Sequence, residues 1–159
     1  MIKRIAAGGV AAVVGISAWG IAGEDNSTRD DSGSIVAAGE VGAFVTRVGD
    51  CYESLSNEST VTTVPGVPCT TAHHWQVFHK EDSALSEYDE DLLDTEMVAV
   101  CNSALEDLVY DMSDETYETF RSSETTYFFP TSESWVQGDR TIDCLQGSDT
   151  VTYYESILE

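Results

Sequence analysis

The sequence has few basic residues: it contains 7 Lys and Arg against 29 Asp and Glu, a formal net charge of −22. A field of this sign repels phosphate, so nucleic acids and anionic lipid surfaces are poor partners for the folded part of the chain. The excess of acid fits an affinity for cations or basic surfaces. We favour the simpler interpretation, an acidic surface that keeps the protein soluble by self-repulsion.

Charge is missing altogether from residues 5–23, an uninterrupted run rich in Ala, Gly, Val and Ile that follows Lys3 and Arg4. This pattern predicts an export signal. The run is long enough to span a bilayer core of roughly 30 Å as a helix, and small residues near its end suit cleavage equally well. We therefore expect residues 1–23 to be a signal anchor, the preferred reading, or a signal peptide, with the folded domain outside the membrane.

Large apolar side chains are scarce in residues 24–42, which are polar and rich in Gly and Ser. Such a segment gains too little from burial to offset the entropy lost on ordering. We predict a flexible polar linker over 24–42, followed by one extracytoplasmic domain over 43–159.

Within that domain the pattern predicts an α+β fold. Alternation and β-branched residues indicate strands at 43–48, 60–64, 73–80, 125–129 and 150–157. Apolar residues at steps of three and four, among them Leu93, Met97 and Cys101, predict a long helix between 86 and 110 with Ser86 or Asp89 as its N-cap. A shorter helix is expected at 114–120. The product is a small, mostly antiparallel sheet packed against one long and one short helix.

The stretch 128–145, FFPTSESWVQGDRTIDCL, is the most informative part of the chain. Pro130 ends a strand because proline has no N–H to donate. We predict a loop at 131–137, a turn at Gly138 and Asp139, and a strand that carries Cys144 to a fixed place.

The chain has four cysteines, and an even number in an exported domain predicts two disulfides. Three pairings are open. We choose Cys51 with Cys69, because both lie beside turns at the ends of neighbouring strands. Cys101 then pairs with Cys144, since Cys101 lies on the inward stripe of the long helix and Cys144 on a strand that this helix covers. A zinc site with His73 or His74 is the alternative, but the CxxC spacing typical of such sites is absent.

Four segments together resemble one known family: GDC at 49–51, VPC at 67–69 followed by His73, a lone Cys101 on a helix, and PTSESWVQGDRTIDCL at 130–145. They look like the septum-formation domain of actinobacterial cell-envelope proteins, over roughly residues 45–146. The sequence departs from the family at His74 and Gln76, where acidic residues are frequent. The resemblance implies an extracytoplasmic, usually membrane-tethered domain associated with septum or cell-wall biology, and it brings no enzymatic activity.

Four residues are candidates for a binding site or a structural motif. His73 is either a structural hydrogen-bonding group near the first disulfide or a ligand contact, and we prefer the first. Trp135 either closes its loop or forms an exposed aromatic platform beside Arg140 for a sugar or peptide. Asp139 and Arg140 are expected to form a turn with an ion pair, which could involve Asp50.

No catalytic residue, metal or cofactor is predicted. With 29 carboxylates a chance pair is expected, the serines resemble loop and cap residues, and the acidic run at 87–96 lacks the spacing of an EF-hand. We expect a non-catalytic module, held at the membrane by its N-terminal segment or secreted, whose partner is an unknown envelope protein or wall component. The alternative is a secreted hydrolase, with two carboxylates about 5–9 Å apart in a cleft, or a ligand- or cation-binding envelope protein.

Overall fold

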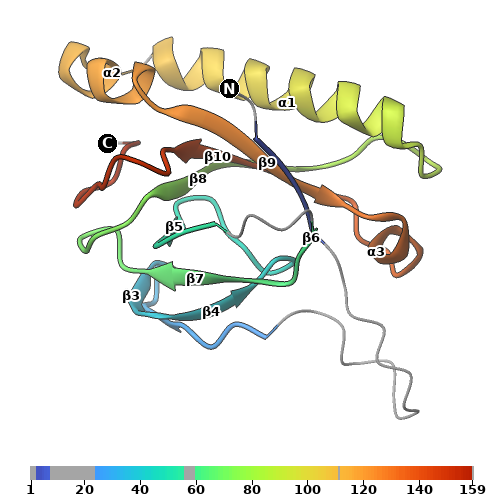
Figure 1. Cartoon of the computed structure of the whole chain (residues 1–159), viewed down its shortest axis with the longest axis horizontal. Coiled ribbons are helices and arrows are strands. Elements are labelled where there is room, and N and C mark those ends of the chain that lie inside the picture. Colours follow the sequence, from blue (N-terminus) through green and yellow to red (C-terminus); the bar gives the residue numbers. More distant parts are fainter. Residues whose placement is uncertain (1–2, 8–23, 56–59, 111, 159) are drawn as a thin grey trace.

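A computed structural model describes residues 3–7, 24–55, 60–110 and 112–158. The fold is α+β, as predicted: a curled, mostly antiparallel sheet is covered on one face by a long helix (Figure 1). In chain order the elements are β1 (Lys3–Ala7), β2 (Thr28–Arg29), β3 (Ile35–Ala37), β4 (Gly39–Gly42), β5 (Cys51–Tyr52), β6 (Thr60–Val61), β7 (Thr63–Val67), β8 (Trp75–Asp82), α1 (Glu90–Tyr110), α2 (Asp114–Arg121), β9 (Glu124–Pro130), α3 (Ser132–Val136) and β10 (Thr141–Gly147).

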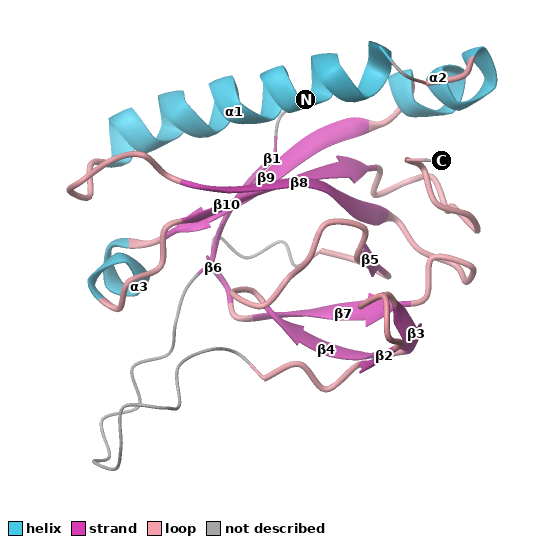
Figure 2. Ribbon diagram, turned by 180° about the vertical axis from the view of Figure 1, so that it is seen from behind, coloured by secondary structure: helices cyan, strands magenta, loops and turns pink. Residues whose placement is uncertain are grey.

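The large sheet has the order β4-β7-β5-β8-β10-β9-β1-β6, and β2 pairs with β3 in a separate small sheet. The centre of the large sheet is formed by β8, β10 and β9. The strand β10 is antiparallel to both of its neighbours. The register of β10 shifts between Cys144 and Leu145. Figure 2 shows α1 over these central strands, with α2 and α3 at opposite ends of the molecule.

The helix α1 forms where the three- and four-residue spacing predicted it. Asp89 caps its first turn, because the Asp89 carboxylate accepts a hydrogen bond from the Leu92 N–H at 3.0 Å. Leu93, Met97 and Cys101 are each 0% exposed and pack against the sheet. The shorter predicted helix is also confirmed as α2, with the Ser113 side chain accepting from the Thr116 N–H.

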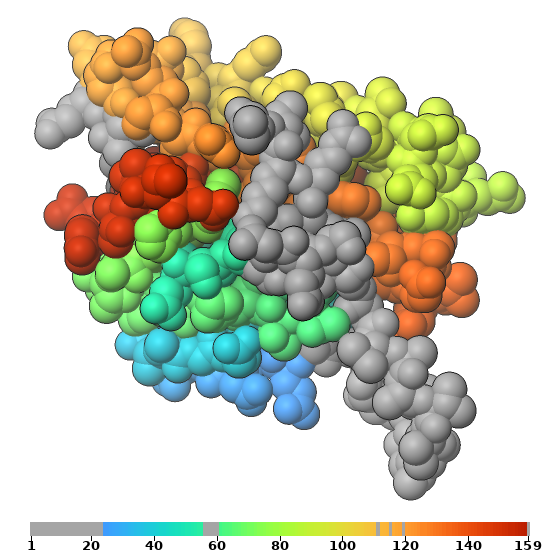
Figure 3. Space-filling view, in the orientation of Figure 1, coloured from blue at the N-terminus to red at the C-terminus, as the bar shows by residue number. Residues whose placement is uncertain are grey.

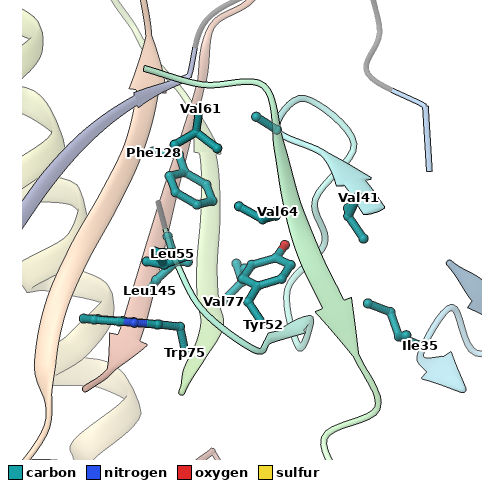
Figure 4. Close-up of a cluster of buried hydrophobic side chains, with 11 residues drawn as sticks. Ile35, Val41, Tyr52, Leu55, Val61, Val64, Trp75, Val77, Phe128 and Leu145 are labelled. Atoms are coloured by element: carbon teal, nitrogen blue, oxygen red, sulfur yellow. The ribbon is translucent and has the colours of Figure 1, made fainter. Parts of the chain in front are cut away.

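Two apolar clusters fill the two faces of the sheet. The first lies under α1 and includes Met97, Tyr127 and Ile142. The second lies on the opposite face, where the curl of the sheet brings Val64 of β7 into one cluster with Val77 of β8 and Leu145 of β10 (Figure 4). Tyr52, Trp75 and Leu145 form its buried centre. Because β10 contributes to both clusters, it is buried along almost its whole length.

Both predicted disulfides are confirmed. Cys51 in β5 is bonded to Cys69 in the loop after β7, with the Cα atoms 5.3 Å apart, and Cys101 in α1 is bonded to Cys144 in β10, with the Cα atoms 5.6 Å apart. The first bond closes a sequence separation of 18 residues and the second one of 43. Loops of these lengths correspond to about 3 to 4 kcal/mol of stabilisation each in the chain-entropy description.

The predicted flexible linker is wrong, because residues 24–42 are part of the fold. They form β2, β3 and β4, and β4 pairs with β7 so that Val41 lies opposite Val64. Val41 is 0% exposed and Ile35 is 7% exposed. Gly39 allows its own backbone to lie close to the backbone of Asn26, since a Cβ at position 39 would lie 2.3 Å from the Asn26 carbonyl oxygen. The loss of conformational entropy on ordering this polar segment is offset by the pairing of β4 with β7, which is distant in the sequence.

Three local predictions are also wrong. Residues 43–48 form turns rather than a strand, and residues 131–137 contain the short helix α3 rather than an irregular loop. Residues 150–157 form no strand but lie in a segment, 148–158, that we call the C-terminal strap. The strap is joined to the loop before β8 by an isolated bridge between His73 and Tyr153.

Of the predicted export signal, only Lys3–Ala7 lies within the described residues. This segment forms β1, which pairs in parallel with β9 so that Lys3 lies opposite Thr126. Residues 1–2 and 8–23, and with them most of the expected signal, lie outside the part of the chain that is described. Among the helices that are described, none has the length and apolar character needed to cross a membrane.

Candidate functional site

The segment from Thr131 to Thr141 folds into a compact motif built on α3. Thr131 and Ser134 form a capping box, in which each side chain accepts a hydrogen bond from the other residue's backbone N–H, at 3.1 and 2.9 Å. Asp139 closes the other end. Its carboxylate accepts from the Ser134 hydroxyl at 2.9 Å and from the Thr141 N–H at 3.0 Å. Gly138, with φ of 98°, makes the turn between α3 and β10.

Trp135 and Arg140 are brought together by this turn. The guanidinium carbon of Arg140 lies 3.7 Å from the centroid of the Trp135 ring, and its Nη1 donates to the Trp135 carbonyl oxygen at 2.8 Å. Tyr88 packs on Trp135 edge to face, with the ring centroids 5.8 Å apart. Trp135 is 6% exposed, so its ring is covered by protein and offers no open face to a sugar.

The suggested ion pair between Arg140 and Asp50 is wrong. Asp50, which is 3% exposed, is held instead by Arg29 through two hydrogen bonds of 2.5 and 2.8 Å. Arg29 Nε also donates to Asp25 at 2.6 Å. The hydrogen bond to Asp50 is the main reason that the pKa of Arg29 is raised. The sequence held one signal for this pair, since Arg29 is the only basic residue between Arg4 and Arg47.

A second buried charge, Asp143, was not singled out from the sequence. It is 1% exposed and lies 3.2 Å from Lys80 Nζ, while the Thr46 hydroxyl donates to it at 2.6 Å. Burial raises the pKa of Asp143, and Lys80 and Thr46 oppose that shift. Lys80 also donates to the Thr46 carbonyl oxygen at 2.9 Å, so the group fastens the turns at 43–48 to the sheet.

His73 is 0% exposed and lies beside the strap. Its Nδ1 donates to the Thr71 carbonyl oxygen at 2.9 Å, and its ring packs on Tyr153 with the centroids 5.9 Å apart. Burial is the main cause that lowers the pKa of His73. Its Nε2 has no hydrogen-bond partner among the described residues. The environment therefore favours the neutral imidazole.

A hollow of about 660 Å³ opens beside the Cys51–Cys69 disulfide. Its lining comes from β3, β5, the loop after β7, β8 and the strap. It includes Val36, Pro68, Thr70, Gln76, Glu155 and Leu158. Figure 3 shows the C-terminal residues in red, lying on the surface against green residues of the middle of the chain. Among the described residues of the lining, Glu155 is the only ionisable side chain, so these residues do not supply the pair of carboxylates expected of a glycosidase.

The strap is held on the body by the residues that precede and begin β8. The Gln76 carboxamide accepts from the Ile157 N–H at 2.9 Å and donates to the Ser156 hydroxyl at 3.1 Å. His74 Nδ1 donates to the Ser148 carbonyl oxygen at 3.0 Å. His74 and Gln76 are the two positions at which the sequence departs from the pattern it resembles, and both of them bind the strap.

One family model matches most of the chain. The family model described as septum formation matches residues 20–144, a stretch that includes both disulfides and the turn from Trp135 to Arg140. The chain belongs to the septum-formation family. This family is not a known enzyme family. No curated protein and no solved structure matches the chain.

Membership in the septum-formation family distinguishes two parts of the candidate site. The motif of Trp135, Asp139 and Arg140 lies within the matched residues, whereas the C-terminal strap lies beyond them. No group of three or more His, Cys, Asp or Glu side chains that could hold a metal ion occurs in the described parts of the chain.

Proposed function

We propose that this protein is a non-catalytic, extracytoplasmic module, tethered to the cell membrane by its N-terminal segment. This tethering requires that residues 3–7 leave their pairing with β9 and enter the membrane with the apolar run. It acts in septum or cell-wall processes by binding an envelope protein or a wall component. Its family supports the connection with the septum. The observation that carries the location is that all four cysteines are paired in two disulfides, because such bonds persist in oxidising compartments and are rare in the cytosol.

The contacts of the motif residues Asp139 and Arg140 support a role without catalysis. Asp139 is engaged by Ser134 and Thr141, and Arg140 is engaged by Trp135. A catalytic acid, base or nucleophile needs free hydrogen-bonding capacity directed at a substrate. Asp139 and Arg140 instead use their hydrogen-bonding capacity within the motif, where they stabilise the connection between β9 and β10.

The location is tested with the full-length chain carrying a C-terminal epitope tag, expressed in an actinobacterial host. We expect the tag to bind antibody on intact cells whose outer layers are permeable to it, to fractionate with the membrane, and to concentrate at division septa. A tag that is detected only after the membrane is opened would contradict an extracytoplasmic domain. A tag spread evenly over the cell surface would contradict a role at the septum.

The matched control reverses the charge ahead of the apolar run. In the double variant Lys3→Glu, Arg4→Glu the positive-inside bias is removed, so we expect export to fall. Intact export of this variant would contradict the assignment of residues 1–23 as the signal.

A second candidate function, binding of a small ligand, is favoured by the hollow of about 660 Å³, a volume in the range of ligand pockets. Thermal-shift measurements with soluble fragments of the cell wall test it. A fragment that binds in the hollow should lose its stabilising effect in the Val36→Trp variant, which fills the entrance from an exposed position of β3.

A further inference from the structure

The two disulfides lie in different surroundings. Cys101 and Cys144 are each 0% exposed and belong to the apolar cluster under α1. Cys51 is 0% exposed as well, but its partner Cys69 is half-buried, and both line the hollow. Of the four cysteines, Cys69 is therefore the one that a molecule entering from solvent can approach.

We propose that the Cys51–Cys69 disulfide is a site of thiol exchange, and that the hollow admits a low-molecular-weight thiol that becomes bonded to Cys69. A volume of about 660 Å³ is sufficient for a small molecule of this kind. The proposal is independent of the suggested role at the septum.

The exchange is balanced without an added oxidant. The thiolate of the incoming molecule attacks Cys69 Sγ, forming a new S–S bond to Cys69 while the bond between Cys69 and Cys51 breaks. Cys51 leaves as a thiolate and takes a proton from solvent. One disulfide has replaced another, and the incoming thiol has replaced Cys51 as the partner of Cys69.

Polar groups that suit the product are already in place. The Gly49 carbonyl oxygen lies 3.9 Å from Cys51 Sγ and 3.3 Å from Cys69 Sγ, so it can accept the S–H that forms on Cys51. The Gln76 Nε2–H group lies 3.7 Å from Cys69 Sγ and can donate to that sulfur. The separated sulfurs therefore retain polar partners, which lowers the penalty of opening the bond.

The lining of the hollow selects among thiols by charge. Glu155 is the only ionisable side chain among the lining residues that the structure describes, and the protein carries a net charge of −22. The attacking thiolate is itself negative and is repelled by this field. A carboxylate on the thiol adds to the repulsion, whereas a cationic group offsets it. We therefore assign the site to thiols without net negative charge.

The test uses the full chain and three probes: cysteamine, which is cationic, 2-mercaptoethanol, which is neutral, and thioglycolate, which is anionic. Exchange is stopped with acid and the products are located by non-reducing peptide mapping. Rates are compared at equal thiolate concentration and divided by the rates on a small uncharged disulfide. We expect adducts on Cys69, at least about tenfold more than on Cys51, with cysteamine fastest and thioglycolate slowest.

Three results would overturn the proposal. The first is an adduct mainly on Cys51, and the second is exchange at Cys101–Cys144 at a similar rate. The third is the absence of any adduct on the native chain under conditions in which the urea-unfolded chain reacts.

Single-cysteine variants separate access from folding. Cys51→Ser leaves a free thiol at Cys69, which should capture cysteamine from its disulfide, cystamine. Cys69→Ser leaves a thiol at the buried Cys51, which should react at least about tenfold more slowly. Equal reactivity of the two variants, with near-ultraviolet circular dichroism like that of the unmodified chain, contradicts selective access through the hollow.

The charge preference has its own matched pair of variants. Glu155→Gln should reduce the ratio of the cysteamine rate to the thioglycolate rate several-fold, because it removes the charge in the lining. Glu87→Gln removes one negative charge from an exposed position in the loop before α1 and should leave the ratio unchanged. The same effect in both variants would refute recognition within the hollow and leave only the net charge of the protein.

Discussion

The guanidinium group of Arg140 lies over the ring of Trp135, 3.7 Å from its centroid, and binds the Trp135 carbonyl oxygen at 2.8 Å. The contact joins α3 to the residue immediately before β10. It also shows why the turn at 138–140 follows so soon after Trp135, since the turn at Gly138 brings the chain back to the Trp135 ring.

We expect Arg140→Lys to lower the free energy of unfolding by about 1 kcal/mol, because lysine cannot both cover the ring and reach the carbonyl oxygen. Arg140→Ala should cost about 2 kcal/mol. Urea denaturation provides the measurement. The control is Arg121→Ala, which removes an exposed ion pair with Glu118 and should change stability by less than about 0.5 kcal/mol. A neutral Arg140→Lys would show that the contact does not stabilise the fold.

The pair of Arg29 and Asp50 should behave as a buried ion pair. Arg29→Met leaves the Asp50 carboxylate, whose side chain is 2% exposed, without its main partner, so we expect a loss of about 3 kcal/mol. Asp50→Leu should be similarly costly. The double variant should lose clearly less than the sum of the two losses, and strict additivity in this double-mutant cycle would contradict a direct interaction.

Residues 24–42 can be tested as part of the core by two adjacent substitutions in β3. Ile35→Ala should lower the free energy of unfolding by roughly 2 kcal/mol, since Ile35 is 7% exposed and packs in the cluster with Val41. Val36→Ala is the control, because Val36 is 52% exposed, and its effect should stay within about 0.5 kcal/mol. A flexible linker would leave both variants as stable as the unmodified chain.

His73 gives a prediction for pH dependence. Burial lowers the pKa of His73 in the folded chain below its usual value of about 6.5, so the unfolded chain binds a proton at His73 more readily than the folded chain does. The stability that His73 contributes is present above about pH 6.5 and is lost as the pH falls below that value. The variant His73→Phe keeps an aromatic ring beside Tyr153 and should lose less stability over this interval. Parallel pH curves for the two proteins, from urea denaturation, would exclude His73 as the titrating group.

The strongest predictions from the sequence concerned segments that repeat a local pattern. The three- and four-residue spacing of Leu93, Met97 and Cys101 predicts the buried face of α1, and α2 forms where the shorter helix is expected. The pairing of the cysteines followed from this, because an inward cysteine on a covering helix must meet the strand beneath it. The motif from Trp135 to Arg140 could be located from its residues, but its internal contacts could not.

The errors concerned segments whose structure depends on distant partners. The sequence predicts a linker at 24–42 because Ile35 and Val41 are too few to form a core by themselves. In the structure they pack in one cluster with Val64 and Tyr52. The alternation at 43–48 predicts a strand. In the structure the turns there place the buried Thr46 side chain in a hydrogen bond with Asp143, which is far away in the sequence. Residues 150–157 do not form a strand, because their backbone pairs with the described part of the chain only through the isolated bridge between His73 and Tyr153.

The sequence by itself determined the α+β class, the long helix, the central strands and both disulfides, because hydrophobic periodicity and cysteine placement are local properties that survive without knowledge of the neighbours. Only the tertiary structure decided that Arg29 pairs with Asp50, that the strap rests on His74 and Gln76, and that a hollow leads to Cys69. Burial, the pairing of charges and the shape of a cavity depend on which residues that are distant in the sequence come into contact. The curl of the sheet decides these contacts.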